Sequence, residues 1–249
     1  MTVGQGRVQA DCSIAAVGAA AKGGRSRTKV GAGQWSRSLG ALLLLIAASP
    51  LAGCAPRVKL RVPPSAIAEL PLERKLTLLD AENELLSAVD ARDLLEERWL
   101  AAREAVDDAW TRKREADDAR DRAKKGSLPL EVPEAAQRES MLRIEFARAD
   151  LELARAQLRA GEGALLAAEA KYEQARAGEV IEAGLTGARG LRAPEFQEQS
   201  DRLAQVAQQR TAEAAKKKEA ADTAAAEWKQ ARAELTKLTG GAQGSAWVQ

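Results

Sequence analysis

Apolar residues that recur every three and four positions are the feature that most constrains how this chain can fold. The period continues from residue 78 to residue 123, with a basic residue at three of its positions. A 3.5-residue period puts a narrow apolar seam on a helix with left-handed supercoiling, so the pattern predicts long helices packed as in a coiled coil. The first series consists of Leu78, Ala81, Leu85, Ala88, Arg92, Leu95, Trp99, Ala102, Val106, Ala109, Lys113, Ala116, Arg120 and Ala123.

Proline and glycine divide the pattern into three helices. Proline suits the first turn of a helix, and glycine suits the position just after its end. Pro71 and Gly126 bracket the first helix, a turn over 126–133 follows, and a glycine-rich break covers 183–194. The sequence therefore predicts a coiled-coil domain over 71–240, with helices at 71–125, 133–183 and 194–239, and a flexible tail at 241–249.

The second and third helices carry seams of the same kind, in which alanine or glycine often alternates with a larger residue. Small seam residues let helices approach to the short end of the usual 8–10 Å, and short connections favour antiparallel neighbours. Aromatic residues make up 3% of the chain, too few to fill a thick core. We therefore expect an all-α fold, a long antiparallel coiled-coil rod of three helices. A two-helix hairpin whose third helix packs on another protomer is the alternative.

The first turn also predicts a register. If it is centred near residue 129, Trp99 lies level with residue 159, beside Leu158 and Gly161. Glycine costs a helix about 1 kcal/mol relative to alanine, so Gly161 needs a packing reason. We expect it to make room for the Trp99 ring, unless Gly161 and Gly163 mark a simple break.

Residues 1–53 have the charge and hydropathy of an export signal. They contain six basic residues and one acidic residue, and Arg37 precedes an apolar run over 39–48. This run is shorter than the ~20 residues that span a bilayer and has the length of a signal-peptide core. No methionine lies between Met1 and Met141. We expect translation to start at an alternative codon read as Val30, so that residues 1–29, with Cys12, are not made.

The run is followed by Leu51, Ala52, Gly53 and Cys54. These four residues resemble the lipobox of bacterial lipoproteins, in its commonest form. The resemblance implies that a diacylglycerol is attached to the Cys54 sulfur, that a peptidase cuts between Gly53 and Cys54, and that the new amino group is acylated. Position 55 is Ala rather than Asp, which by analogy directs the protein to the periplasmic face of the outer membrane rather than to the inner membrane.

Residues 54–70 are expected to form a proline-rich tether behind the lipidated cysteine. Such a segment is mostly extended. The alternation of Val58, Leu60 and Val62 leaves a short strand open as another interpretation. Arg57, Lys59 and Arg61 would lie beside anionic headgroups or simply be solvated.

The composition offers little for catalysis. The chain has no histidine, and its second cysteine, Cys54, is assigned to lipid. Acidic residues recur beside basic residues, which is typical of a solvated helix face. Nucleic-acid binding would need a concentrated basic face. We therefore expect no enzyme, no catalytic residue, no cofactor, no metal ion and no nucleic-acid partner.

Two functions fit these features best. The first is a structural spacer or scaffold in the cell envelope that projects a rod into the periplasm. The second is an adaptor or accessory subunit of a secretion, efflux or assembly complex, or a self-associating protein, that contacts its partner with Leu128, Leu130 and Val132 in the first turn. Those residues could equally cap the end of the bundle. A periplasmic chaperone is a third possibility, although filled seams leave no cavity for a client.

Overall fold

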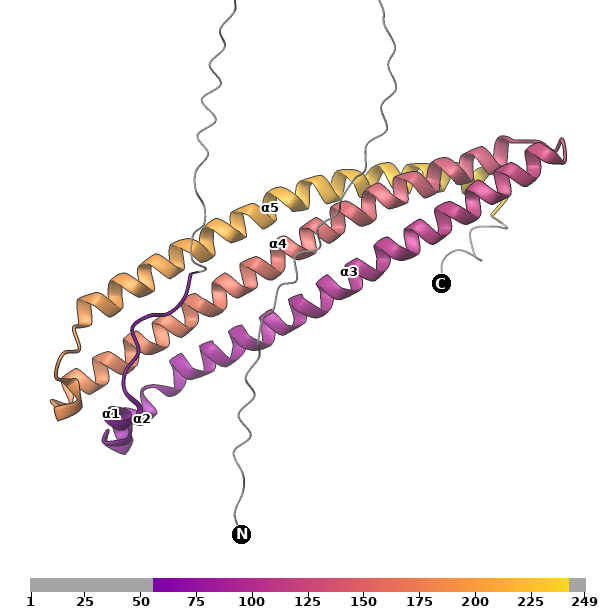
Figure 1. Cartoon of the computed structure of the whole chain (residues 1–249). Helices are drawn as coiled ribbons and strands as arrows, with labels where there is room; N and C mark the ends of the chain where they lie inside the picture. The colour runs from indigo at the N-terminus through magenta and orange to yellow at the C-terminus, as the bar shows by residue number, and fades with distance from the viewer. Residues whose placement is uncertain (1–55, 242–249) are drawn as a thin grey trace, which may run out of the picture. The chain divides into compact units, whose positions relative to one another are not determined.

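Three long helices run back and forth in the structure, a computed structural model that describes residues 56–241 (Figure 1). The described residues contain no strand, which confirms the all-α prediction. The expectations for residues 1–55 and 242–249 lie outside the described residues. The elements in chain order are α1 (Pro64–Ala68), α2 (Leu72–Leu76), α3 (Leu79–Lys125), α4 (Glu131–Glu182), the 3-10 turn η1 (Thr186–Ala188) and α5 (Ala193–Leu238).

The predicted boundaries of the second and third helices agree with α4 and α5 within two residues. The first prediction was wrong at its start, because the helix is interrupted at Thr77 and Leu78. Glu179 on α4 accounts for this break. Its Oε1 lies 2.7 Å from the Thr77 hydroxyl and its Oε2 lies 2.9 Å from Arg74. Leu78 is buried in the same region, so α2 turns to follow the end of α4.

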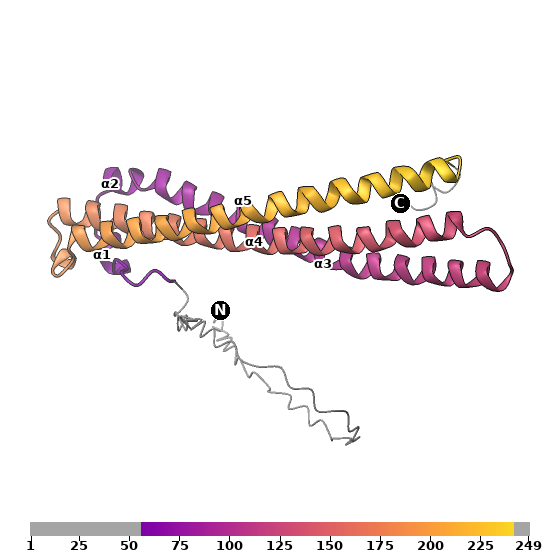
Figure 2. The same cartoon turned by 90° about the horizontal axis from the view of Figure 1, so that it is seen from above.

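Helix α4 lies in the middle of the helical unit, with α3 and α5 packed against it (Figures 1 and 2). Consecutive helices are antiparallel, as expected, and α5 packs on α4 of the same chain. Among the described helices, α3 and α5 share no extensive interface with each other. We call the end with the α3–α4 turn the distal end and the end with η1 the proximal end.

A central helix needs two packing surfaces, and two glycines show both on α4. A Cβ on Gly161 would lie 2.7 Å from Leu95 Cδ1 of α3. A Cβ on Gly163 would lie 3.2 Å from the Cα of Ala207 on α5. Residues two apart on a helix point about 200° away from each other. These two glycines therefore allow close approach to α4 by α3 on one side and by α5 on the other.

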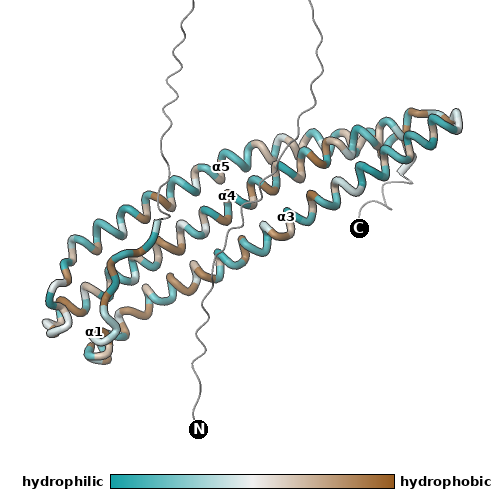
Figure 3. The backbone as a smooth tube through the Cα atoms, viewed as in Figure 1, coloured by the Kyte–Doolittle hydropathy of each residue, from teal (hydrophilic) through white to brown (hydrophobic). Residues whose placement is uncertain are grey.

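The seam predicted for the first helix is confirmed by burial. Ala102, Ala109, Ala116 and Ala123 are all buried at intervals of seven residues. Apolar residues accordingly appear as short patches along each helix rather than as one continuous block (Figure 3). The predicted partner of Gly161 was wrong by about one turn, because Leu95 occupies the space assigned to Trp99. A second seam on α4, absent from the sequence prediction, contains Gly163, Ala170 and Ala177 and faces α5 or the N-terminal segment.

The expectation of a free tether is wrong for the part that the structure describes. Residues 56–63 follow the side of α4 and α5, and α1 packs against η1. We call residues 56–63 the strap. Val62, Ala66 and Leu70 belong to one buried cluster with Val180 and Phe196 at the proximal end. Packed apolar side chains, rather than proline content, determine the conformation of this segment.

Three glycines of α4 provide a graded test of this packing. Gly178 has open space where a Cβ would lie, so Gly178→Ala should stabilise the fold by up to about 1 kcal/mol through helix propensity. Gly161→Ala should be close to neutral, because the end of the Leu95 side chain can move. Gly163→Ala should destabilise by about 1–2 kcal/mol, because it meets backbone of Ala207. Urea unfolding followed by circular dichroism measures all three, and equal effects would contradict the two-sided packing.

Candidate functional site: the strap and the distal end

The residues predicted to be functional lie at opposite ends of the described chain. Gly53 and Cys54 are outside the described residues, just before the strap begins. Leu128 in the α3–α4 turn is 61% exposed, whereas Leu130 and Val132 are partly buried. Of the residues predicted to be functional, the structure therefore describes only the three of the distal turn, while the strap is the described segment next to Cys54 in the sequence.

The strap alternates as an extended segment would. Val58 is 7% exposed and Val62 is 2% exposed, whereas Arg57, Lys59 and Arg61 are exposed. Alternate residues of extended backbone point to opposite sides. Val58 packs with Ala170 of α4 and Leu203 of α5. The apolar side of the strap thus closes a groove on the α4–α5 pair, and its basic side faces outward.

A buried glutamine holds the middle of the strap. The side-chain oxygen of Gln199, which is 4% exposed, accepts the backbone N–H groups of Lys59 at 2.8 Å and Leu60 at 2.9 Å. Its amide nitrogen donates to the Leu60 carbonyl at 3.2 Å. The strap has extended backbone without a neighbouring strand, and one α5 side chain substitutes for the ladder of hydrogen bonds that a sheet would supply.

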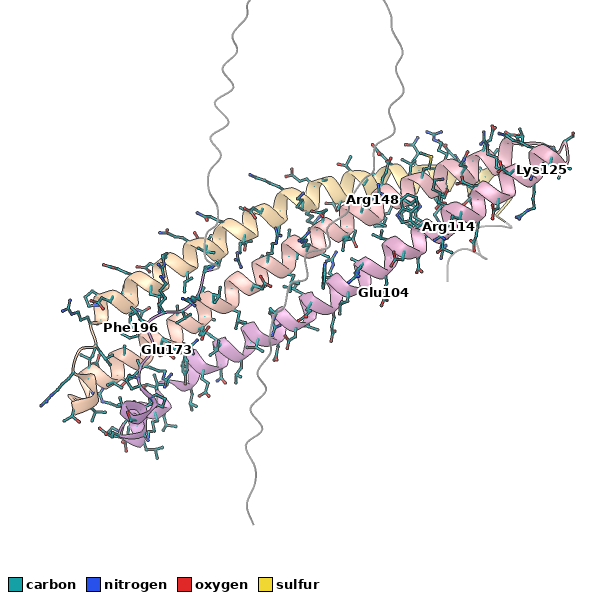
Figure 4. All side chains as sticks on the ribbon, viewed as in Figure 1. Glu104, Arg114, Lys125, Arg148, Glu173 and Phe196 are labelled. Atoms are coloured by element: carbon teal, nitrogen blue, oxygen red, sulfur yellow. The ribbon has the colours of Figure 1, made fainter. Side chains whose placement is uncertain are left out.

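A buried carboxylate holds the next part of the strap. Glu173 Oε2 accepts the backbone N–H of Val62 at 2.7 Å, and its Oε1 accepts Arg176 Nη1 at 2.7 Å. The charge of Glu173 is therefore compensated inside the protein, as burial requires. Arg61 adds an exposed pair with Glu169. Figure 4 shows Glu173 on α4 and Phe196 on α5 in the proximal half, where the strap lies.

The sequence indicated only part of how the strap is held. The alternation of Val58, Leu60 and Val62 predicted extended backbone, but the prolines favoured a tether. Gln199 and Glu173 went unrecognised, because a glutamine and a glutamate on a charged helix look like ordinary surface residues. Only their burial in the folded chain distinguishes them.

The distal end contains a cavity of about 150 Å³ enclosed by all three long helices. Val132, one of the predicted contact residues, lines it, while Leu128 lies exposed in the adjoining turn. The seams are therefore not filled at this end, contrary to the expectation from sequence. The small and apolar lining residues are Ala116, Ala119, Val132, Pro133, Ala136, Ser140, Leu235, Thr236 and Thr239.

Three arginines, one from each long helix, also line this cavity. They are Arg112 of α3, Arg143 of α4 and Arg232 of α5. Burial lowers the pKa of Arg143, and the positive charges of Arg112 and Arg232 lower it further, while Glu139 and Asp108 oppose the shift. An arginine remains protonated despite such a shift. The cavity wall therefore combines apolar groups with three arginines, of which Arg143 is the desolvated one. Two carboxylates, Glu115 and Glu139, also line it.

Trp228 fixes two of these arginines. Its ring is stacked on Phe146, with centroids 5.1 Å apart, and its Nε1 donates to Glu139 Oε1 at 2.6 Å. The guanidinium carbons of Arg143 and Arg232 lie 5.5 and 5.6 Å from the ring centroid. Cation–π attraction of this kind orients an arginine without neutralising it. The sequence analysis did not select this group, whose members are dispersed along α4 and α5.

Neither a metal-binding cluster nor a membrane-spanning helix is present among the described residues. No group of three or more His, Cys, Asp and Glu side chains is placed to hold a metal ion. None of the helices that the structure describes has the length and apolar character needed to cross a membrane.

The role of Gln199 can be tested by proteolysis. In Gln199→Ala the N–H groups of Lys59 and Leu60 lose their acceptor, which should destabilise strap docking by about 1–2 kcal/mol. Trypsin cleavage after Lys59 and Arg61 should then accelerate by about tenfold relative to the wild-type protein. Gln208→Ala, at an exposed position of α5, is the matched control. Unchanged cleavage in Gln199→Ala would show that the strap is held by its valines alone.

No family model matches the chain, and no curated protein or solved structure is significantly similar to it.

Proposed function

We propose that this protein is a lipid-anchored helical scaffold of the bacterial cell envelope, held on the periplasmic face of the outer membrane, and not an enzyme. The observation that carries this proposal is the position of the lipobox-like residues Leu51–Cys54. The described fold begins at residue 56, two residues after Cys54. Cleavage before Cys54 would therefore remove the leader and leave the whole helical unit attached to lipid.

The energetics of anchoring support this assignment. Each buried methylene contributes about 0.8 kcal/mol, and two or more acyl chains give stable attachment where one does not. Ala55 in place of Asp supports the outer membrane as the destination by analogy with other lipoproteins. The acyl chains would supply the membrane contact, so the helices can retain charged surfaces.

A scaffold also needs surface for partners, and the edge helix α3 offers it. Because α4 is the only described helix with which α3 shares an extensive interface, much of the circumference of α3 is uncovered. Six leucines of α2 and α3 are between 46% and 68% exposed. Apolar surface of this extent is typical of interaction sites, which supports an envelope protein or a second copy of this chain as partner. The six are Leu72, Leu76, Leu79, Leu86, Leu94 and Leu100.

An adaptor that binds a partner with its distal end is the second candidate. It is favoured by the exposed Leu128 next to a cavity that combines apolar lining with three arginines. A partner segment with an apolar residue beside a carboxylate would complement this wall. The short turn between α3 and α4 presents both features at one end of the helical unit.

Replacement of the lipidated residue tests the main proposal. Cys54→Ala should accumulate as the uncleaved precursor and lose acylation, because both processing steps need the thiol. Mass spectrometry of the N-terminal peptide and detergent phase partitioning measure the two effects. Ser36→Ala, upstream of the apolar run, serves as the control and should be processed normally. Normal cleavage of Cys54→Ala, or a wild-type protein that carries no acyl chain, would refute the assignment.

A pair of leucine variants distinguishes the adaptor from the scaffold. Leu128→Glu changes the distal turn, and Leu94→Glu changes an equally exposed leucine, 66% against 61%, on the edge helix α3. Loss of a co-purified envelope partner in Leu128→Glu alone, by at least tenfold, is the result expected of an adaptor. Loss in Leu94→Glu alone would assign the partner to α3 and exclude the distal end.

A further inference from the structure

The strap determines where on the helical unit a lipid at Cys54 can be attached. Read backwards from α1, the chain contacts progressively more distal parts of the bundle. Ala66 lies against Gly187 in η1, Val62 binds Glu173, and Val58 packs between Ala170 and Leu203. The strap therefore runs from the proximal end toward the middle of α4 and α5, and its first described residue, Pro56, is two residues from Cys54 in the sequence.

The covalent reach of the chain limits the position of Cys54. Four residues separate it from Val58, and an extended chain covers at most ~3.6 Å per residue, which gives about 14 Å. The level of Ala170 lies about 18 Å from the last residue of α4, Glu182, and about 58 Å from its first, Glu131, at the helical rise per residue. Even if the chain reversed after Val58, Cys54 would not reach past the proximal end.

An upright bundle conflicts with this limit. If the bundle stood upright on its proximal end, the part between the start of the strap and that end would lie inside the bilayer. That part carries exposed charged residues, including Glu182, Arg189 and Arg192. Charged side chains are strongly disfavoured in hydrocarbon. A bundle with its side against the membrane satisfies the anchor without placing these charges in hydrocarbon.

The outward side of the strap has the charge that such a contact requires. Arg57, Lys59 and Arg61 are exposed within seven residues of Cys54. Arg61 pairs with Glu169 of α4, so Arg57 and Lys59 carry most of the uncompensated positive charge on this side of the strap. Basic residues beside a membrane anchor attract anionic headgroups. The fold fixes the position of this surface, because backbone N–H groups of the strap donate hydrogen bonds to Gln199 and Glu173.

We propose that the strap face is a bilayer-binding surface and that the lipid attaches the bundle side-on, in its proximal half, so that its long axis lies along the membrane. This inference rests on the proposed lipidation of Cys54. It replaces the expectation of a spacer that projects away from the membrane. Both ends of the bundle, including the distal cavity, then lie close to the headgroups.

The test measures the height of both ends above the bilayer. Processed, lipidated protein is reconstituted into vesicles of phosphatidylethanolamine and phosphatidylglycerol that contain a headgroup acceptor dye. A donor dye is attached to Leu128→Cys at the distal end or to Arg189→Cys at the proximal end, both at exposed positions. Lys59→Cys is the reference for a position at the surface. Energy transfer from the two ends should agree within about twofold.

An upright bundle would hold the Leu128 label roughly 60–80 Å from the surface, and transfer from it would fall more than fivefold below transfer from Arg189→Cys. That result would overturn side-on attachment while leaving the lipoprotein assignment intact. Mass spectrometry of the same preparation separates the two proposals. An N-terminal peptide without acyl chains would overturn the lipoprotein assignment and, with it, the side-on attachment.

Discussion

Close packing of α4 on two sides is the constraint on which the rest of the structure depends. A Cβ at Gly161 would meet the movable end of the Leu95 side chain on α3, whereas a Cβ at Gly163 would meet the backbone of Ala207 on α5. Each glycine costs α4 about 1 kcal/mol of helix propensity relative to alanine. In return, α3 and α5 can approach α4 closely on its two faces. Because α4 serves both neighbours, α3 and α5 need not pack on each other. The open edges and the groove for the strap follow from this arrangement.

The strap lies in a groove in the proximal half, and polar side chains of that groove accept the backbone N–H groups of the strap. Extended backbone laid on helices has no strand to accept its N–H groups, and buried unpaired donors are costly. Gln199 and Glu173 supply the missing acceptors from α5 and α4. Arg176 in turn compensates the Glu173 charge. A segment that composition describes as a linker thereby becomes part of the core, and the start of the described chain is held at the side of the bundle.

At the distal end the same three helices enclose a cavity instead of a strap. Trp228 stacks on Phe146 and orients Arg143 and Arg232 toward a wall otherwise lined by small residues. The two halves thus differ in what occupies the space between the helices. If the strap face lies on the membrane, the distal end is positioned for partners that are themselves at or in the membrane, which suits a scaffold or adaptor better than a spacer.

The sequence by itself determined the helices. The heptad series of alanines, together with Pro71, Gly126, Pro133 and Pro194, predicted the all-α class and the ends of α4 and α5 within two residues, because local propensity and helix capping depend on near neighbours. It also predicted the buried alanines of α3, while the anchoring site at the lipobox-like residues stays a prediction. Other features were decided only by tertiary structure: the second seam of α4, the partner of Gly161, the docking of the strap, and the meeting of three arginines from three helices. Each of these joins residues that lie tens of positions apart or more. A one-turn change of register replaces one neighbour by another, as Leu95 replaces Trp99, while the seam pattern in the sequence stays the same.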